Sequence, residues 1–216
     1  MCIFRLLFLL IGSMNKLLNL PYFGSVWHWA QLASPGVNII EAHGNYLRRT
    51  FRSRTTIMSA NGPISLTVPV YSNNDEPYSL SRINYSTDWA SEHLNAFASA
   101  YNASPFYEFY EDDFKAVYNR HHEKLWDLNI DLMNLVAELI DIELNLDYTE
   151  DYIKNPEDCM DLRIGIEHKR GDALKEGLRE VPYYQVFKDR YGFVGGMSIL
   201  DLLFNMGPEG KLVLQA

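Results

Sequence analysis

The sequence KLLNLPYFGSVWHWAQLASPGVNIIE, residues 16–41, contains the pattern that indicates the fold class. Two short apolar runs, Lys16–Leu20 and Val37–Glu41, have strand character, and they flank an amphipathic stretch, Ser25–Ala33. Pro35-Gly36 ends that stretch, because proline and glycine both disfavour continuation of a helix. The pattern predicts a strand–helix–strand unit at the start of an α/β or α+β domain with a mixed sheet.

A β-hairpin is predicted near residues 56–70. Two β-rich runs, Thr56–Ala60 and Ile64–Val70, enclose Asn61-Gly62-Pro63. Asn-Gly is the strongest short hairpin signal, because both residues tolerate the positive φ angles of a tight turn.

Helices are predicted over much of the remaining chain. Apolar residues recur at three- and four-residue steps over residues 113–141, which predicts one long helix there. A shorter helix is expected to begin at Thr87. Ser198–Asp201 has the spacing of a capping box and Gly207-Pro208 supplies a stop, so a two-turn helix is expected between them.

The composition argues against several classes of protein. A chain of 216 residues with 47% hydrophobic content can bury a substantial core, so residues 14–216 are expected to form a single domain. The formal net charge of −9 argues against a nucleic-acid binder, which needs a broad basic face. The two cysteines lack metal-ligand spacing, and the common zinc, P-loop and dinucleotide motifs are missing from the sequence, so neither a metal nor a cofactor is expected.

Residues 1–13, MCIFRLLFLLIGS, have two interpretations. They are either a leader, because an apolar run follows Arg5 and small residues follow that run, or an artefact of start-site choice, with translation beginning at Met14. The second interpretation is favoured. The run is too short to span a bilayer, and no other stretch approaches eighteen apolar residues. A cytoplasmic protein without a stable membrane span is therefore expected.

Positive charge is concentrated in the segment Asn45–Ile57 of this acidic chain. Arg48, Arg49, Arg52 and Arg54 fall within seven positions, and their mutual repulsion requires a compensating anion. If a strand begins here, side chains two positions apart share a face, which would place Arg52 and Arg54 together. Such a pair can bind a phosphate or carboxylate group of a ligand. The alternative roles for these arginines are ion pairs with acidic residues of the protein and simple exposure to solvent.

Three blocks of the chain resemble the WbqC-like protein family, especially its shorter form from Bacteroidetes. The first block is Leu17–Gly24, in which a strand ends at Pro-Tyr-Phe. The second is Asn45–Arg54, together with the Asn-Gly turn and the Thr-Val-Pro-Val of residues 67–70. The third is a set of short motifs, the last of which is Ser198–Asn205. Together they span nearly all of residues 14–210. Longer relatives tend to have paired acidic residues just before the basic block, where this chain has His43-Gly44, and Glu41 is the nearest substitute.

The resemblance implies a transferase that assembles precursors of surface polysaccharide such as O-antigen. The reaction most consistent with that role is transfer of an acyl or aminoacyl group, from its donor, to an amino sugar or a nucleotide sugar that carries phosphate or carboxylate groups. The alternative is a non-catalytic binding or scaffolding partner of polysaccharide-assembly enzymes, with the basic block as its docking patch. A transferase should place the arginines in a concave pocket with His93 and a carboxylate, whereas a scaffold should place them on a flat or convex surface.

The candidate catalytic residues are His93, Glu41 and Asp201. His93 is chosen because histidine titrates nearest neutrality, and a hydrogen-bonded core histidine is its alternative role. Glu41 ends the second predicted strand, where ligand sites of α/β proteins gather. Asp201 is a catalytic carboxylate, the partner of an arginine, or a residue of the capping box. His43 is a second histidine candidate. The anion or substrate site is assigned to Arg49, Arg52, Arg54 and Tyr46.

Overall fold

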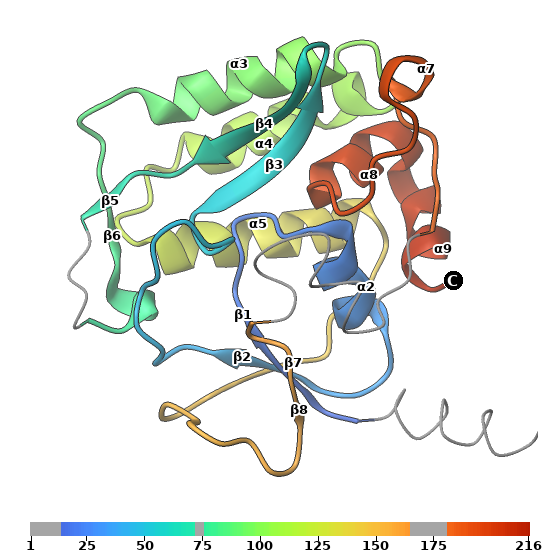
Figure 1. Ribbon diagram of the computed structural model, residues 1–216. Coiled ribbons are helices and arrows are strands. Elements are labelled where there is room, and N and C mark those ends of the chain that lie inside the picture. Colours follow the sequence, from blue (N-terminus) through green and yellow to red (C-terminus); the bar gives the residue numbers. More distant parts are fainter. Residues whose placement is uncertain (1–13, 72–75, 165–180) are drawn as a thin grey trace, which may run out of the picture.

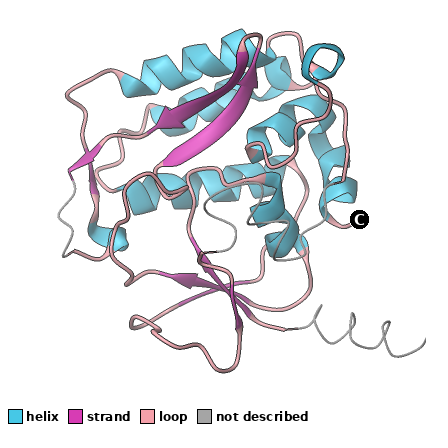
Figure 2. Ribbon diagram, in the orientation of Figure 1, coloured by secondary structure: helices cyan, strands magenta, loops and turns pink. Residues whose placement is uncertain are grey.

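The computed structural model describes residues 14–71, 76–164 and 181–216 and has a mixed α/β fold (Figure 1). The leader or alternative start predicted at residues 1–13 lies outside the described residues. A small parallel sheet lies at the bottom of the view, and helices together with an antiparallel hairpin lie above it (Figure 2). In the described part of the chain, no helix is both long enough and apolar enough to cross a membrane.

Four short parallel strands form the main sheet. They are β1 (Lys16–Asn19), β2 (Asn38–Glu41), β7 (Leu146–Tyr148) and β8 (Met160–Asp161), in the order β7-β2-β1-β8. The central pair is in register from Lys16 opposite Asn38 to Asn19 opposite Glu41. Because β7 and β8 also pair in parallel with this centre, the carboxyl ends of all four strands meet at one edge.

Helix α2 (Val26–Ala33) connects β1 to β2, which confirms the predicted strand–helix–strand unit. Ser25 is the N-cap of the helix, and its hydroxyl accepts a hydrogen bond from the backbone N–H of His28. Beyond the helix, Gly36 has a φ of 109°, which residues with a Cβ rarely adopt. Lys16 ties the end of the helix to β1, since its ammonium donates to three carbonyls there.

The predicted hairpin is present as β3 (Arg54–Ser59) and β4 (Gly62–Thr67). The two strands are antiparallel, and Ile57 lies opposite Ile64. Its turn ends at Gly62, which has a φ of 106°. A second antiparallel pair, β5 (Val70–Tyr71) and β6 (Arg82–Ile83), follows, and the 3-10 helix η1 (Tyr78–Leu80) precedes β6.

The single long helix predicted near residues 113–141 is wrong. The chain forms two helices in this region, α4 (Tyr107–Tyr118) and α5 (Leu125–Leu139). Between them His121 has a φ of 51°, and the carbonyl of Glu123 accepts a hydrogen bond from the backbone N–H of Ile83 in β6. This strand-like pairing uses backbone groups that a continuous helix would need. Both helices bury apolar residues, so the periodicity continues across the break.

The remaining helices complete the core. They are α3 (Trp89–Tyr101), α7 (Lys188–Tyr191), α8 (Ile199–Met206), the 3-10 helix η2 (Gly207–Glu209) and α9 (Gly210–Leu214). The N-cap of helix α3 is Asp88, one residue after the predicted Thr87, and its carboxylate accepts a hydrogen bond from the backbone N–H of Ser91. The predicted two-turn helix is α8, which is buried from residue 199 to 205 and packs against α2, α3, α4 and β3.

Candidate functional site

A cavity of about 430 Å³ opens at the carboxyl ends of the parallel strands. Its walls include the last residues of three strands, Asn19 of β1, Glu41 of β2 and Asp161 of β8, together with Arg52 and Arg163. In open α/β sheets, ligands bind in the crevice beyond the carboxyl ends of the strands. The cavity therefore has the position of a binding site.

The carboxylate of Glu41 organises the floor of the cavity. Its side chain is buried, and Oε1 accepts hydrogen bonds from the backbone N–H of His43 (2.9 Å) and from the hydroxyl of Thr149 (2.9 Å). Oε2 accepts from the backbone N–H of Ile153 (3.2 Å) and from Nη1 of Arg163 (3.1 Å). Four donors satisfy this buried carboxylate, so Glu41 ties β2 to the chain that follows β7 and β8.

Arg163 pairs with a second carboxylate in the same wall. Its Nε and Nη2 donate to Oδ1 (2.9 Å) and Oδ2 (2.7 Å) of Asp161, a bidentate arrangement that holds the pKa of Asp161 below its ordinary value. Nη1 also donates to the carbonyl of Ile153 (2.6 Å). The guanidinium lies over the ring of Tyr152, with Cζ 5.4 Å from the ring centroid. Each guanidinium nitrogen of Arg163 therefore has an acceptor within the protein.

Asn19 connects Arg163 to Arg52. Its Nδ2 donates to the carbonyl of Arg163 (2.8 Å), and its Oδ1 accepts from Nη2 of Arg52 (2.7 Å). The Arg52 guanidinium also lies over the ring of Tyr78, with Cζ 5.7 Å from the centroid. The carbonyl of Arg52 accepts from Nδ2 of Asn129 (2.8 Å). Arg52 is thus a buried cation that several neighbours hold in place at the cavity wall.

The structure separates the residues of the predicted anion site. Arg52 lines the cavity, whereas Arg54 lies in the hairpin, where its Nε donates to Thr67 across the two strands (3.2 Å). The expected common face of Arg52 and Arg54 does not form, because residues 51–53 are a turn and β3 begins only at Arg54. Arg49 is exposed and has a φ of 63°. Tyr46 is buried, with its hydroxyl bonded to Ser53 (2.7 Å).

His93 lies in the helical layer and does not line the cavity. It is buried in α3, with Nδ1 2.7 Å from the hydroxyl of Tyr22, which in turn bonds to the hydroxyl of Tyr118. Burial lowers the pKa of His93 to about 4, and a hydrogen bond with the backbone of Thr67 opposes that shift. The structure therefore gives His93 the geometry of a hydrogen-bonded core histidine and does not bring it to Arg52.

Asp201 also lies outside the cavity wall. Its Oδ1 accepts from the hydroxyl of Tyr101 (3.0 Å), and its Oδ2 accepts from the hydroxyl of Tyr183 (2.7 Å) and from Nε2 of Gln185 (2.7 Å). Burial raises the pKa of Asp201, and these three hydrogen bonds limit the rise. The Asp201 carboxylate thus connects α8, which carries it, to α3 and to residues 183–185.

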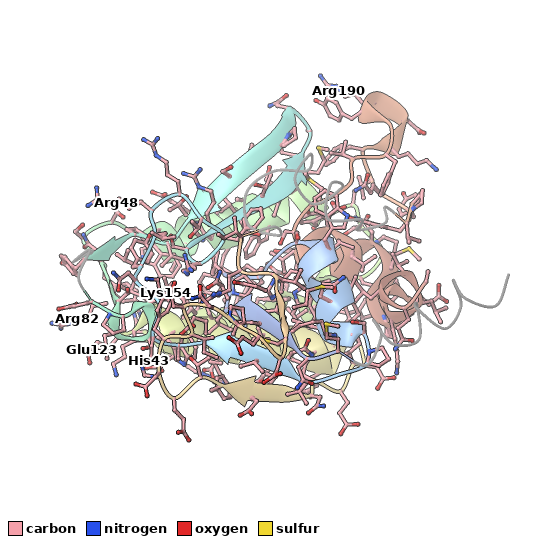
Figure 3. All side chains as sticks on the ribbon, turned by 60° about the horizontal axis from the view of Figure 1, so that its bottom comes forward. His43, Arg48, Arg82, Glu123, Lys154 and Arg190 are labelled. Carbon is pink, nitrogen blue, oxygen red and sulfur yellow. The ribbon has the colours of Figure 1, made fainter. Side chains whose placement is uncertain are left out.

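His43, the second histidine candidate, does line the cavity and is half-buried. Figure 3 shows His43 and Lys154 on the same side of the molecule, far from Arg190 near the hairpin turn. Asn19, Asp161, Arg163 and Tyr152 were not predicted to be site residues. The available signal was the position of Asn19 in a predicted parallel strand, whereas β8 has only two residues and shows no periodicity.

Comparison with known protein families finds a match over most of the chain. A model of the WbqC-like protein family matches residues 20–173, a range that contains every residue named above at the cavity except Asn19. No curated protein and no solved structure matches the chain. Among the described residues, no group of three or more His, Cys, Asp or Glu side chains is placed to hold a metal ion.

Proposed function

Because the chain belongs to the WbqC-like protein family, we propose that it is a cytoplasmic transferase that assembles surface-polysaccharide precursors, O-antigen included. Its substrate in this proposal is a nucleotide sugar that carries an amino group. The group transferred to that amine is an acyl or aminoacyl group. The cavity at the carboxyl ends of the parallel strands is the proposed binding site.

The position of Arg52 in the cavity wall is the observation that carries the proposal. The charge of Arg163 is matched by the two carboxylates that it contacts, Glu41 and Asp161. Arg52 adds a second guanidinium to the same wall, and phosphate and carboxylate groups are the ligands that a guanidinium binds best. The cavity volume, about 430 Å³, is also within the usual range for small-molecule sites.

His43 is the residue we assign to proton transfer. The ammonium group of the sugar must lose one proton before its nitrogen attacks the carbonyl carbon of the donor. As the new C–N bond forms, the nitrogen loses a second proton. The bond between the carbonyl carbon and the leaving group breaks, and the leaving group departs with that electron pair and takes up a proton. An imidazole at the cavity wall is suited to accept the first of these protons. Glu41 is assigned a positioning role, because its carboxylate accepts the backbone N–H of His43 and is fully occupied by other donors.

The proposal is tested by thermal-shift measurements with a panel of nucleotide sugars. A ligand at 100 times its Kd stabilises a protein by about 2.7 kcal/mol, which is a shift of several degrees in Tm. Arg52→Gln should abolish the shift, because it removes the cation from the cavity wall. Arg54→Gln makes the same chemical change outside the cavity and should keep the wild-type shift.

The substrate, the position of the anion site and the role of His43 can each be contradicted separately. A wild-type protein that no nucleotide sugar stabilises contradicts the substrate and favours the non-catalytic binding or scaffolding role. Equal losses in Arg52→Gln and Arg54→Gln would place the anion site outside the cavity. His43→Gln should keep the thermal shift and lose transfer of a labelled acyl or aminoacyl group; retained transfer would remove His43 from the reaction.

A further inference from the structure

The rim of the cavity carries exposed apolar side chains. Leu47, Tyr152 and Ile164 are 52%, 55% and 72% exposed, and all three line the cavity. Eleven large hydrophobic side chains are exposed in the described part of the chain, and three of these eleven lie at the opening of the cavity. An opening that combines these side chains with a buried cation suits a ligand with an anionic part and an apolar part.

Contacts with Arg163 and Glu41 fix the position of Tyr152 and of the backbone beside it. The guanidinium of Arg163 covers one region of its ring, with Cζ 5.4 Å from the centroid. The next residue, Ile153, is bound at both backbone groups, since its N–H donates to Glu41 and its carbonyl accepts from Arg163. The chain beside Tyr152 is therefore fixed while more than half of the side chain faces solvent. A fixed, exposed aromatic ring is pre-organised to stack on a planar group.

We propose that Tyr152 stacks on the nucleobase of a nucleotide whose phosphates contact Arg52. This inference rests on the proposed function and adds recognition of the base to it. Arg163 links the two ends of the site, because its side chain backs Tyr152 while its carbonyl holds Asn19, the partner of Arg52. Stacking accepts the π-face of any base, so Tyr152 distinguishes nucleotides from simple sugar phosphates without selecting one base.

Isothermal titration calorimetry with four probes tests the inference. The probes are UDP, GDP, UDP-N-acetylglucosamine and N-acetylglucosamine 1-phosphate. Base stacking contributes about 1–3 kcal/mol by alanine substitution, which corresponds to roughly 5- to 150-fold in Kd. Tyr152→Ala should weaken the three nucleotides by a factor in that range and leave the Kd of the sugar phosphate within about twofold. Tyr152→Phe keeps the ring and should keep wild-type affinity.

A matched control is available in β7. Tyr148 is 43% exposed and does not line the cavity, so Tyr148→Ala should leave all four affinities unchanged. Circular dichroism and the Tm without ligand establish that each variant is folded. Unchanged nucleotide affinity in Tyr152→Ala overturns the stacking inference while the proposed function stands. Equal losses for nucleotides and sugar phosphate also overturn it, because the base would then not be the partner. If none of the probes binds the wild-type protein, the proposed function fails as well.

Discussion

Glu41 and Arg163 are 122 positions apart in the sequence and form an ion pair of 3.1 Å at the floor of the cavity. Both side chains are nearly inaccessible to solvent. The pair holds the end of β2 against the chain that follows β8, so the cavity wall depends on it. A buried ion pair costs desolvation when it forms, and removal of one partner leaves the other as an uncompensated buried charge.

Replacement of Arg163 by methionine should destabilise the fold strongly. Arg163→Met leaves the carboxylate of Glu41 buried without its cation, which costs about 3–5 kcal/mol in the free energy of unfolding. Urea unfolding measures this loss. Arg82→Met is the matched control, because the Arg82–Glu123 pair (3.0 Å) has side chains 67% and 70% exposed and should contribute less than about 1 kcal/mol. Equal losses in the two variants would contradict a structural role for the buried pair.

Two buried histidines should make the fold sensitive to acid. Burial lowers the pKa of His28 and of His93 to about 4, from an ordinary value of 6.5. Below pH 6.5 the unfolded chain therefore binds two protons that the folded chain excludes, and the free energy of unfolding should fall as the pH drops from 6.5 to 4. The slope is at most about 1.4 kcal/mol per pH unit for each histidine.

The acid sensitivity is checked by urea unfolding at several pH values. His93→Gln removes one of the two titrating groups, so the decline between pH 6.5 and 4 should be about half as steep as in the wild type. A variant that also carries His28→Gln should lose most of the remaining slope. If the slope is the same in all three proteins, the two histidines are not the groups that titrate.

Tyr22 should contribute more to stability than its partner Tyr118. The hydroxyl of Tyr22 bonds to both Nδ1 of His93 and the hydroxyl of Tyr118, so Tyr22→Phe leaves two buried polar groups without this partner. The expected loss is about 1–3 kcal/mol in the free energy of unfolding. Tyr118→Phe keeps the bond between Tyr22 and His93 and should cost less. A larger loss in Tyr118→Phe, measured by thermal or urea unfolding, would contradict this arrangement.

Local patterns in the sequence were sufficient to predict the strand–helix–strand unit, the hairpin and α8. Each has its start or stop signal within a few residues, such as Asn61-Gly62 for the hairpin and Ser198 for α8. The break between α4 and α5 could not be predicted in this way. It depends on pairing of residues 123–125 with residues 81–83, which are distant in the sequence.

The residues of the cavity were predictable only in part, because some of them come together through pairing between segments that are distant in the sequence. Arg52 and Glu41 were candidates because of local charge and position at a strand end. Arg163 and Asp161 reach the cavity through β8, whose two residues carry no periodic signal, and the parallel pairing of β8 with β1 is a long-range contact. His93 and Asp201 were candidates because of their chemistry, whereas tertiary packing surrounds both with buried tyrosines.

The close approach of Gly196 to Trp27 gives a sharp test of packing beside α2. Gly192 and Gly196 have nearly equal φ angles, 69° and 70°, so alanine is strained at both positions. A Cβ at Gly196 would overlap the ring of Trp27, whereas a Cβ at Gly192 would have no heavy atom within 4 Å. Gly196→Ala should therefore lower the free energy of unfolding by about 1–3 kcal/mol more than Gly192→Ala. Equal losses in urea unfolding would show that the Trp27 ring moves aside without cost.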